Sequence, residues 1–350
     1  MAGIIYSKMV GKNDPVYGKI ETPVKMLIEN ESNACEKRKS ITKALFNVEK
    51  SHRFAETFIG QSDFDIFQSV AEGQGGENDN IETTYKKVIE HVTFMKEFSI
   101  TKEMMEDAKF GIAVEGKDKA KNFIRAYYKT QNQLCERALI NATNANFTYA
   151  KATFDLTAPD GKPLFYNQHE YHTEKMKKAP KQSNRFCIKD FTSSTNAFET
   201  ALGELSVRMR DYNDDNGDPM GYLADTIIIP GNMYKVESVA KKAVGSERTT
   251  GSDWNDINLQ YGNWDIVVLP EWRPANPAFM LMSREANHQL HGNNLFNRTK
   301  LEISNWVDNH TRNLIWSGRA RFGVGFAAWK HIMLCEQGES LTGCTPVTLQ

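Results

Sequence analysis

One stretch of the chain, residues 196–244, constrains the fold most, because helix, turn and strand signals follow one another there with little ambiguity. Apolar residues recur three or four positions apart from Ala197 to Met209, the spacing that lines one face of a helix. We expect Thr195 or Asn196 to cap the start of this helix, because their side chains accept hydrogen bonds from free backbone N–H groups. The stretch therefore begins with an amphipathic helix.

A tight turn, a buried strand and a second helix follow. Asp214–Pro219 combines Asp, Asn, Gly and Pro, the residues that favour turns. Ile227–Ile229 is a β-branched run stopped by Pro230, which predicts a strand buried on both faces. A second helix is expected from near Asn232, with Val236, Val239, Ala240 and Ala243 on its inner side.

The acidic turn also raises the question of calcium. An EF-hand loop starting at Asp211 needs Gly at its sixth position and Glu at its twelfth, where this chain has Asn216 and Tyr222. The sequence therefore favours a tight turn without a metal.

This order of elements resembles the major capsid proteins of Mu-like and related tailed phages, which have the Hong Kong 97-type fold. Gly161–Phe165, followed by His169 and then Ser183 and Asn184, is similar to the segment before the helix in those proteins. Trp264–Pro270 is similar to the strand that follows the second helix. The resemblance spans about residues 54–335 and rests on the order of several weak motifs.

The resemblance implies an α+β fold with a defined division of the chain. The expected parts are an N-terminal arm (1–53), an extended hairpin loop (54–112), a first part of a peripheral domain with a long spine helix (113–163), an axial domain (164–274), a second part of the peripheral domain (275–337) and a C-terminal tail (338–350). In those proteins the arm and the hairpin loop reach adjacent subunits.

Residue patterns outside the central stretch fit this division. A helix is expected at Ser32–Val48, and a hairpin with sides Phe64–Val70 and Tyr85–Ile100 around the Gly-rich tip Glu72–Asn80. An ordinary hairpin packed on its own domain is the alternative. A three/four apolar spacing from Asp118 to Asn144 predicts a helix about 40 Å long.

The last part of the sequence is almost entirely β in pattern. The expected strands are Phe279–Met282, Leu301–Val307, Asn313–Val324 and Ala328–Leu334. We expect them to complete the sheet beneath the spine helix.

Composition excludes several classes of protein. The 350 residues carry a formal charge of -1, so no global basic field is available for tight binding of nucleic acid. The five cysteines are scattered and odd in number, which favours reduced thiols in a cytoplasmic compartment. No apolar run is long enough for a signal peptide or a membrane span, so we expect a soluble protein made without export.

Candidate chemical sites are few. His169 and His172 form an HxxH in a loop, which lacks the HExxH order of a metalloprotease helix. His288 and His291 lie in a polar stretch without an acidic or Cys neighbour. No nucleophile elbow, phosphate loop or dinucleotide fingerprint is present. We therefore expect no catalytic, metal or cofactor site.

Some proteins of the resembled fold join subunits through a self-catalysed Lys–Asn isopeptide bond. The hairpin tip has no Lys, and the nearest are Lys86 and Lys87. This speaks against covalent crosslinking.

The resemblance implies a major capsid protein of a phage or prophage. It would self-assemble into pentamers and hexamers, with residues Gly245–Asp253 near the ring centre, and close into an icosahedral shell around double-stranded DNA without sequence-specific binding. Implied partners are a separate scaffolding protein, a portal and possible decoration proteins. The implied location is the virion capsid, assembled in the bacterial host cytoplasm. An encapsulin-type nanocompartment shell and an enzyme of unrecognised class are the alternatives.

Overall fold

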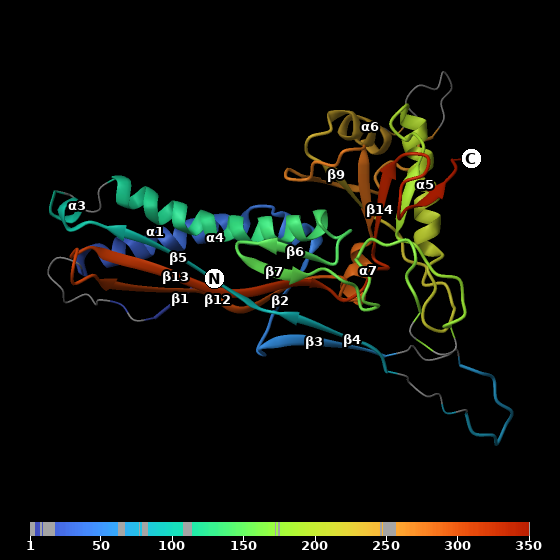
Figure 1. Ribbon diagram of the computed structural model, residues 1–350, viewed down its shortest axis with the longest axis horizontal. Helices are drawn as coiled ribbons and strands as arrows, with labels where there is room; N and C mark the ends of the chain where they lie inside the picture. The colour runs from blue at the N-terminus through green and yellow to red at the C-terminus, as the bar shows by residue number, and fades with distance from the viewer. Residues whose placement is uncertain are drawn as a thin grey trace.

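The computed structural model describes residues 4–7, 9, 18–61, 67–76, 78, 83–107, 114–171, 173, 176–245, 247 and 257–349. These residues form a long lobe, a second lobe at one end of it, and a hairpin that extends away from both lobes (Figure 1). The N-terminal end lies on the long lobe and the C-terminal end on the second lobe. None of the described helices is long and apolar enough to cross a membrane.

The long lobe is built on a five-stranded sheet. Its central pair is β12 (Asn293–Val307) and β13 (Leu314–Phe326), which run antiparallel, and β5 (Val92–Ile100) lies on the other side of β13. Two short strands, β1 (Ile5–Tyr6) and β2 (Asn47–Lys50), pair in parallel with different parts of β12. Two segments of the N-terminal region therefore complete the edge of this sheet.

Two helices cover one face of the sheet. The long helix α4 (Val114–Ile140) and α1 (Gly18–Lys37) lie side by side (Figure 1). Val24 and Ile28 of α1 and Ile124 of α4 meet Trp316 of β13 in one buried cluster. The predicted long helix is confirmed, although it begins and ends about four residues earlier than expected.

The N-terminal region differs from expectation. The helix predicted at residues 32–48 is instead α1, a short α2 (Ile41–Leu45) and strand β2. Pro23 lies inside α1, where it removes a helix hydrogen bond and normally costs about 3 kcal/mol. Burial of Val24 and Ile28 against α4 offsets that cost. From residue 18 onward this region packs on its own chain.

The second lobe is built on a six-stranded sheet, so we call it the six-stranded lobe. Its strands, in spatial order, are β10 (Asp265–Leu269), β9 (Thr226–Pro230), β11 (Ala278–Met282), β14 (Ile332–Gln337), β8 (Arg185–Ile188) and β15 (Thr345–Val347). Helices α5 (Thr195–Arg210) and α6 (Tyr234–Gly245) belong to this lobe, and α7 (Arg284–Gln289) follows β11. The three Ile of β9 are fully buried, as the sequence predicts.

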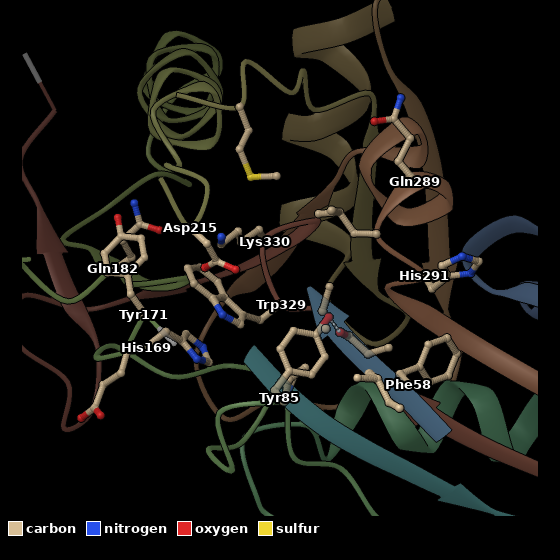
Figure 2. A pocket seen from close by; sticks show the side chains of 18 residues that line it. Phe58, Tyr85, His169, Tyr171, Gln182, Asp215, Gln289, His291, Trp329 and Lys330 are labelled. Atoms are coloured by element: carbon tan, nitrogen blue, oxygen red, sulfur yellow. Dashed lines mark hydrogen bonds between the residues drawn. The ribbon is translucent and has the colours of Figure 1, made fainter. Parts of the chain in front are cut away.

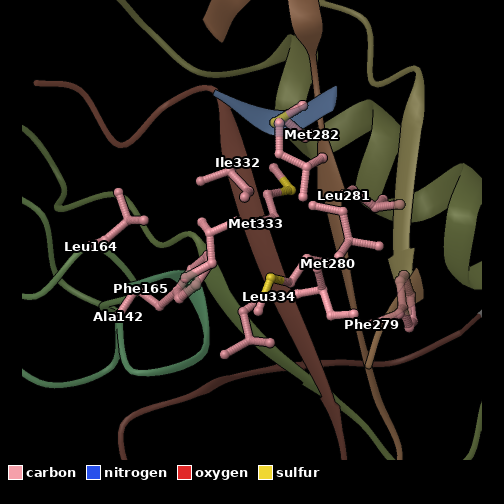
Figure 3. Packing of buried hydrophobic residues seen from close by; sticks show 14 of the residues in the cluster. Ala142, Leu164, Phe165, Phe279, Met280, Leu281, Met282, Ile332, Met333 and Leu334 are labelled. Atoms are coloured by element: carbon pink, nitrogen blue, oxygen red, sulfur yellow. The ribbon is translucent and has the colours of Figure 1, made fainter. Parts of the chain in front are cut away.

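Two late strands and the C-terminal tail were assigned wrongly. β11 and β14 were expected beneath the long helix, but they form the centre of the six-stranded sheet. Side chains of both strands, from Phe279 to Met282 and from Ile332 to Leu334, belong to one buried cluster (Figure 3). All five residues of β11 are buried, which requires a covered position between neighbouring strands. The expected tail contributes β15, which pairs with β8.

Ser194 caps α5, and not Thr195 or Asn196 as expected. Its side chain accepts a hydrogen bond from the Ala197 N–H at 3.1 Å. The helix therefore begins at Thr195, two residues before the first residue of the apolar spacing, and Phe198 joins its buried face.

The acidic turn after α5 is a tight turn, as predicted. One carboxylate oxygen of Asp214 accepts hydrogen bonds from the backbone N–H groups of Asn216, Gly217 and Asp218, at 2.7 to 2.9 Å. The oxygen is thus used by the turn itself, and Gly217 supplies the positive φ that the turn requires.

The projecting hairpin consists of β3 (Ala55–Gln61) and β4 (Thr83–Glu90), which pair antiparallel. Its first side was expected at residues 64–70. Of these, 64–66 lie outside the described residues and 67–70 form no strand. Its second side ends at Glu90, because the chain passes His91 and continues as β5 in the long-lobe sheet. The period-two pattern of residues 85–100 therefore belongs to two strands in different sheets.

Three small elements complete the description. The hairpin β6 (Asn146–Tyr149) and β7 (Ala152–Asp155) follows α4, and α3 (Lys102–Asp107) follows β5. The Thr101 hydroxyl accepts a hydrogen bond from the Met104 N–H at 3.3 Å, which caps the start of α3.

Candidate functional site: the projecting hairpin and its base

The hairpin exposes apolar side chains along its length. Ile59 is 59% exposed and Phe54 is 74% exposed, and Val88 of the opposite strand is also exposed. In the segment beyond β3, Phe67 is fully exposed and Val70 is half-exposed. A two-stranded ribbon is marginal in water by itself, and apolar groups on it favour contact with another surface.

The base of the hairpin is fixed closely to β13. A Cβ atom added at Gly323 would lie 2.3 Å from the backbone oxygen of Glu90, and one added at Gly325 would lie 2.8 Å from the Ile89 side chain. Ile89 is buried by this contact. Only glycine allows the end of β4 to approach β13 so closely.

An ion pair made by a buried lysine adds a second attachment. The Lys87 ammonium donates to Asp155 at 2.6 Å and to the Thr157 hydroxyl at 2.8 Å, which ties β4 to β7. Burial lowers the pKa of Lys87, because the Lys87 side chain is almost fully covered. Burial by itself raises the pKa of Asp155, but hydrogen bonds from Lys87 and Thr157 lower it overall. The half-exposed carboxylate thus stays ionised beside a cation that has lost its water.

The lysines considered for crosslinking are both in β4. Lys87 is engaged with Asp155 and Thr157, and Lys86 is exposed on the strand. The described part of the tip, residues 72–76 and 78, contains no Lys. Crosslinking therefore has no support from the placement of Lys87.

A cavity of about 270 Å³ lies beside the hairpin base, where the hairpin, the 159–171 loop, the acidic turn and α7 meet (Figure 2). Phe58 and Tyr85 come from the hairpin side, and His169 and Trp329 line the opposite side. The Tyr85 hydroxyl donates to the Ala327 carbonyl at 3.3 Å. The cavity thus lies at the junction of the hairpin and the two lobes.

His169 holds this junction together and has the environment of a structural residue. Its Nδ1 lies 2.6 Å from an Asp160 carboxylate oxygen, and its Nε2 lies 3.2 Å from the Asn184 amide oxygen. The ring stacks on Trp329 with centroids 4.2 Å apart. Both nitrogens therefore face hydrogen-bond acceptors, an arrangement that does not activate a nucleophile.

The other residues of the HxxH stretch do not join His169 in a metal site. Glu170 is exposed and pairs with Lys181 at 2.6 Å, and His172 lies outside the described residues. Within the described residues there is no group of three or more His, Cys, Asp or Glu side chains that could hold a metal ion.

His288 and His291 lie in the stretch that is polar in the sequence. His288 is exposed but lies on helix α7, and His291 follows it with a positive φ of 48°. The His291 ring lies 3.4 Å from a Glu49 carboxylate of β2, a neighbour that sequence proximity could not reveal. His291 also borders the cavity next to Phe58.

A buried polar cluster lies between the lobes and has no signal in the sequence. His331 Nε2 lies 2.8 Å from the Asn293 side-chain oxygen, and the Asn293 amide donates to the Leu45 carbonyl at 2.9 Å. Asn287 of α7 accepts from the Asn293 backbone N–H at 2.7 Å. Burial lowers the pKa of His331 to about 3, so the ring is neutral. No local motif marks these residues, because they come from four separate elements.

Comparison with solved structures identifies the fold. The chain is similar to the capsid protein in the capsid structure of the cyanophage P-SCSP1u, with a TM-score of 0.51 and 13% sequence identity over 87% of this chain and 89% of that chain. Two others are the capsid of Myoviridae phage XM1 (TM-score 0.47, 11% identity, 86% and 93% covered) and the procapsid of bacteriophage JBD30 (TM-score 0.46, 13% identity, 92% and 76% covered).

No protein-family pattern matches this sequence, and no curated protein does. The shared architecture nonetheless places the chain in the class of α+β proteins with the Hong Kong 97-type fold of phage capsids. The resemblance predicted from residues 54–335 is confirmed at the level of fold.

Proposed function

We propose that this chain is the major capsid protein of a tailed phage or prophage and that it assembles into the head shell. The observation that carries the proposal is the projecting hairpin, which extends apolar side chains away from a Hong Kong 97-type fold. Such a ribbon gains stability when a second copy covers it. Its base, held by Gly323 and Lys87, keeps it pointed away from its own chain.

The proposed assembly is a closed shell of pentamers and hexamers. In it the long lobe is the peripheral domain and the six-stranded lobe is the axial domain, whose loop after α6 approaches the ring centre. Most of that loop, residues 246 and 248–256, lies outside the described residues. Many weak contacts add up in such a shell, because each subunit already held in place raises the effective concentration of the next contact.

The proposed contents and partners follow from this role. The shell encloses double-stranded DNA by confinement, which a chain with a formal charge of -1 does not oppose. A separate scaffolding protein, a portal and decoration proteins complete the head. The proposed location is the virion capsid, with assembly in the host cytoplasm. The role is structural, and the engagement of both His169 nitrogens supports a role without catalysis.

Negative-stain microscopy of the full-length protein tests the proposal, first alone and then with a candidate scaffold from the same genome neighbourhood. We expect closed shells or rings of five and six subunits. A monodisperse monomer or dimer under every assembly condition would refute the proposal. Analysis of the shell contents separates the alternatives, because an encapsulin-type shell would contain a cargo enzyme in place of DNA.

A further inference from the structure

A groove of about 670 Å³ in the long lobe is lined by several basic side chains. It lies between the end of α1 with α2 on one wall, α4 on the other, and part of β12. We call it the basic groove, and its cationic lining residues are Arg38, Lys39, Lys43, Arg125, Lys129 and Lys300. The whole chain has a formal charge of -1, so six cationic side chains around one groove concentrate positive charge locally.

Few carboxylates oppose these cations. Glu31 pairs with Arg125 at 2.7 Å, and Glu36 accepts a hydrogen bond from the Tyr128 hydroxyl at 3.3 Å. Among the described residues, Lys39, Lys129 and Lys300 have no carboxylate within ion-pairing distance. Like charges gathered with few counter-ions repel one another, so a polyanion in the groove would relieve that repulsion.

The walls of the groove are hydrogen-bonded to each other, and several of its charged side chains are exposed. The Thr42 hydroxyl donates to Asn132 at 2.8 Å, and the Gln131 amide donates to Asn297 at 3.0 Å, so the walls are bonded to each other and to β12. Lys39, Lys129 and Lys300 are exposed. Exposed lysines around a cleft can pair with the regularly spaced phosphates of a nucleic-acid backbone. Such contacts do not distinguish one base sequence from another.

We propose that the basic groove binds the phosphate backbone of nucleic acid without sequence preference, and that it therefore faces the interior of the shell. The proposal rests on the proposed function, because a packaged genome is the polyanion that such a shell would hold in excess. An acidic segment of a protein partner is the competing occupant. The tests below separate the two and separate this proposal from shell formation.

The first test measures binding of a labelled 30-base-pair duplex to the unassembled full-length protein by fluorescence anisotropy, at several salt concentrations. The variant Lys39→Gln/Lys129→Gln/Lys300→Gln removes three groove charges. The control Lys96→Gln/Lys235→Gln/Lys242→Gln removes three exposed charges elsewhere. We expect the groove variant to bind at least ten-fold more weakly than the control and its salt slope to fall by about 2 to 3, because each phosphate contact contributes about 0.9 to that slope.

Equal affinities of the groove variant and the control for the duplex would overturn the proposal. So would groove-dependent binding of labelled polyglutamate without binding of the duplex, since that result assigns the groove to an acidic polypeptide. Microscopy of both variants keeps the two proposals apart. Shells that form normally while groove-dependent binding is absent would sink only the inference about the groove, whereas failure of every variant and of the native chain to form shells would sink the capsid proposal.

A native thiol reports which way the groove faces. Cys35 lines the groove and is partly exposed, whereas the other four cysteines are buried. A bulky PEG-maleimide is expected to label Cys35 in the unassembled protein but not in closed shells, while small N-ethylmaleimide labels both. Labelling of closed shells by the bulky reagent at the unassembled rate would place the groove outside and contradict the proposal.

Discussion

Single residues decide how closely the elements of this chain approach one another. Gly318 of β13 leaves room for Phe123 of α4, and a Cβ atom there would lie 2.4 Å from the phenyl ring. Gly323, further along the same strand, leaves room for the end of β4. The two glycines thus set the height of the long helix above the sheet and the position of the hairpin base.

The glycine at the hairpin base should be intolerant of a methyl group. We expect Gly323→Ala to lower the free energy of unfolding by about 1 to 3 kcal/mol, because a Cβ atom would overlap the backbone oxygen of Glu90. Urea unfolding followed by circular dichroism measures the change. Gly75→Ala is the matched control, since nothing lies within 4 Å of a Cβ atom at that position. Equal stabilities of the two variants would disprove the close approach.

Buried His331 should make stability depend on pH. Its pKa is about 3 in the folded chain and about 6.5 when unfolded, so the unfolded chain binds the extra proton. Neutral His331 therefore makes its full contribution to the free energy of unfolding above about pH 6.5, and this contribution is lost as the pH falls towards 3. We expect the native chain to lose about 1 kcal/mol per pH unit more than His331→Gln between pH 6 and 4.

Urea midpoints measured across that pH range test the expectation. His288→Gln serves as the control, because it removes an exposed histidine of α7 in place of a buried one. If His331→Gln kept the full pH dependence, another group would have to account for it.

At the scale of elements, the cap of helix α5 is expected to affect the stability of the folded chain, and the hairpin is expected to affect assembly. Ser194→Ala is expected to cost about 1 kcal/mol of stability, because it leaves the Ala197 N–H without its side-chain acceptor. Thermal unfolding gives the change, with the neighbouring exposed Ser193→Ala as control. If Ser193→Ala lost as much stability as Ser194→Ala, the loss could not be attributed to the cap.

The hairpin is expected to act on assembly and hardly on folding. Ile59→Asp/Val88→Asp places charges on its exposed apolar positions, which are covered only by a neighbour in the proposed shell. We expect loss of shells in sedimentation and microscopy while the unfolding free energy falls by less than about 1 kcal/mol. Ile59→Val/Val88→Ile retains the apolar surface and should assemble normally. Normal shells from the charged variant would show that the hairpin does not join subunits.

At the scale of the whole molecule, two surfaces of different chemistry should respond differently to salt. Apolar contacts through the hairpin are not screened, whereas phosphate contacts in the basic groove weaken steeply as salt rises. We expect shells to persist at about 0.5 M NaCl, where binding of duplex DNA to the unassembled chain is lost. Sedimentation and anisotropy at matched salt concentrations measure the two. Parallel loss of both would mean that assembly itself depends on exposed charges.

Local sequence patterns determined the elements that carry a strong periodic or turn signal. The apolar stripe of α4, the three Ile of β9 and the Asp214 turn were predictable, because each signal lies within one element. The resemblance to capsid proteins also came from the order of such signals, and the fold confirmed it. The Asp214 carboxylate accepts hydrogen bonds from backbone N–H groups of the turn itself. The turn could therefore be predicted without knowledge of any distant residue.

Tertiary structure alone decided which sheet each late strand joins and where the hairpin begins. β11 and β14 read as plain apolar strands, and only pairing with β9 and β8 places them in the six-stranded sheet. Apolar and polar residues alternate in the same way in any sheet. The period-two pattern across His91 therefore could not show that β4 and β5 belong to different sheets. The His331 cluster and the basic groove likewise join residues from separate elements. A sequence therefore determines local periodicity and turn chemistry, whereas long-range pairing and the gathering of charge depend on how the whole chain packs.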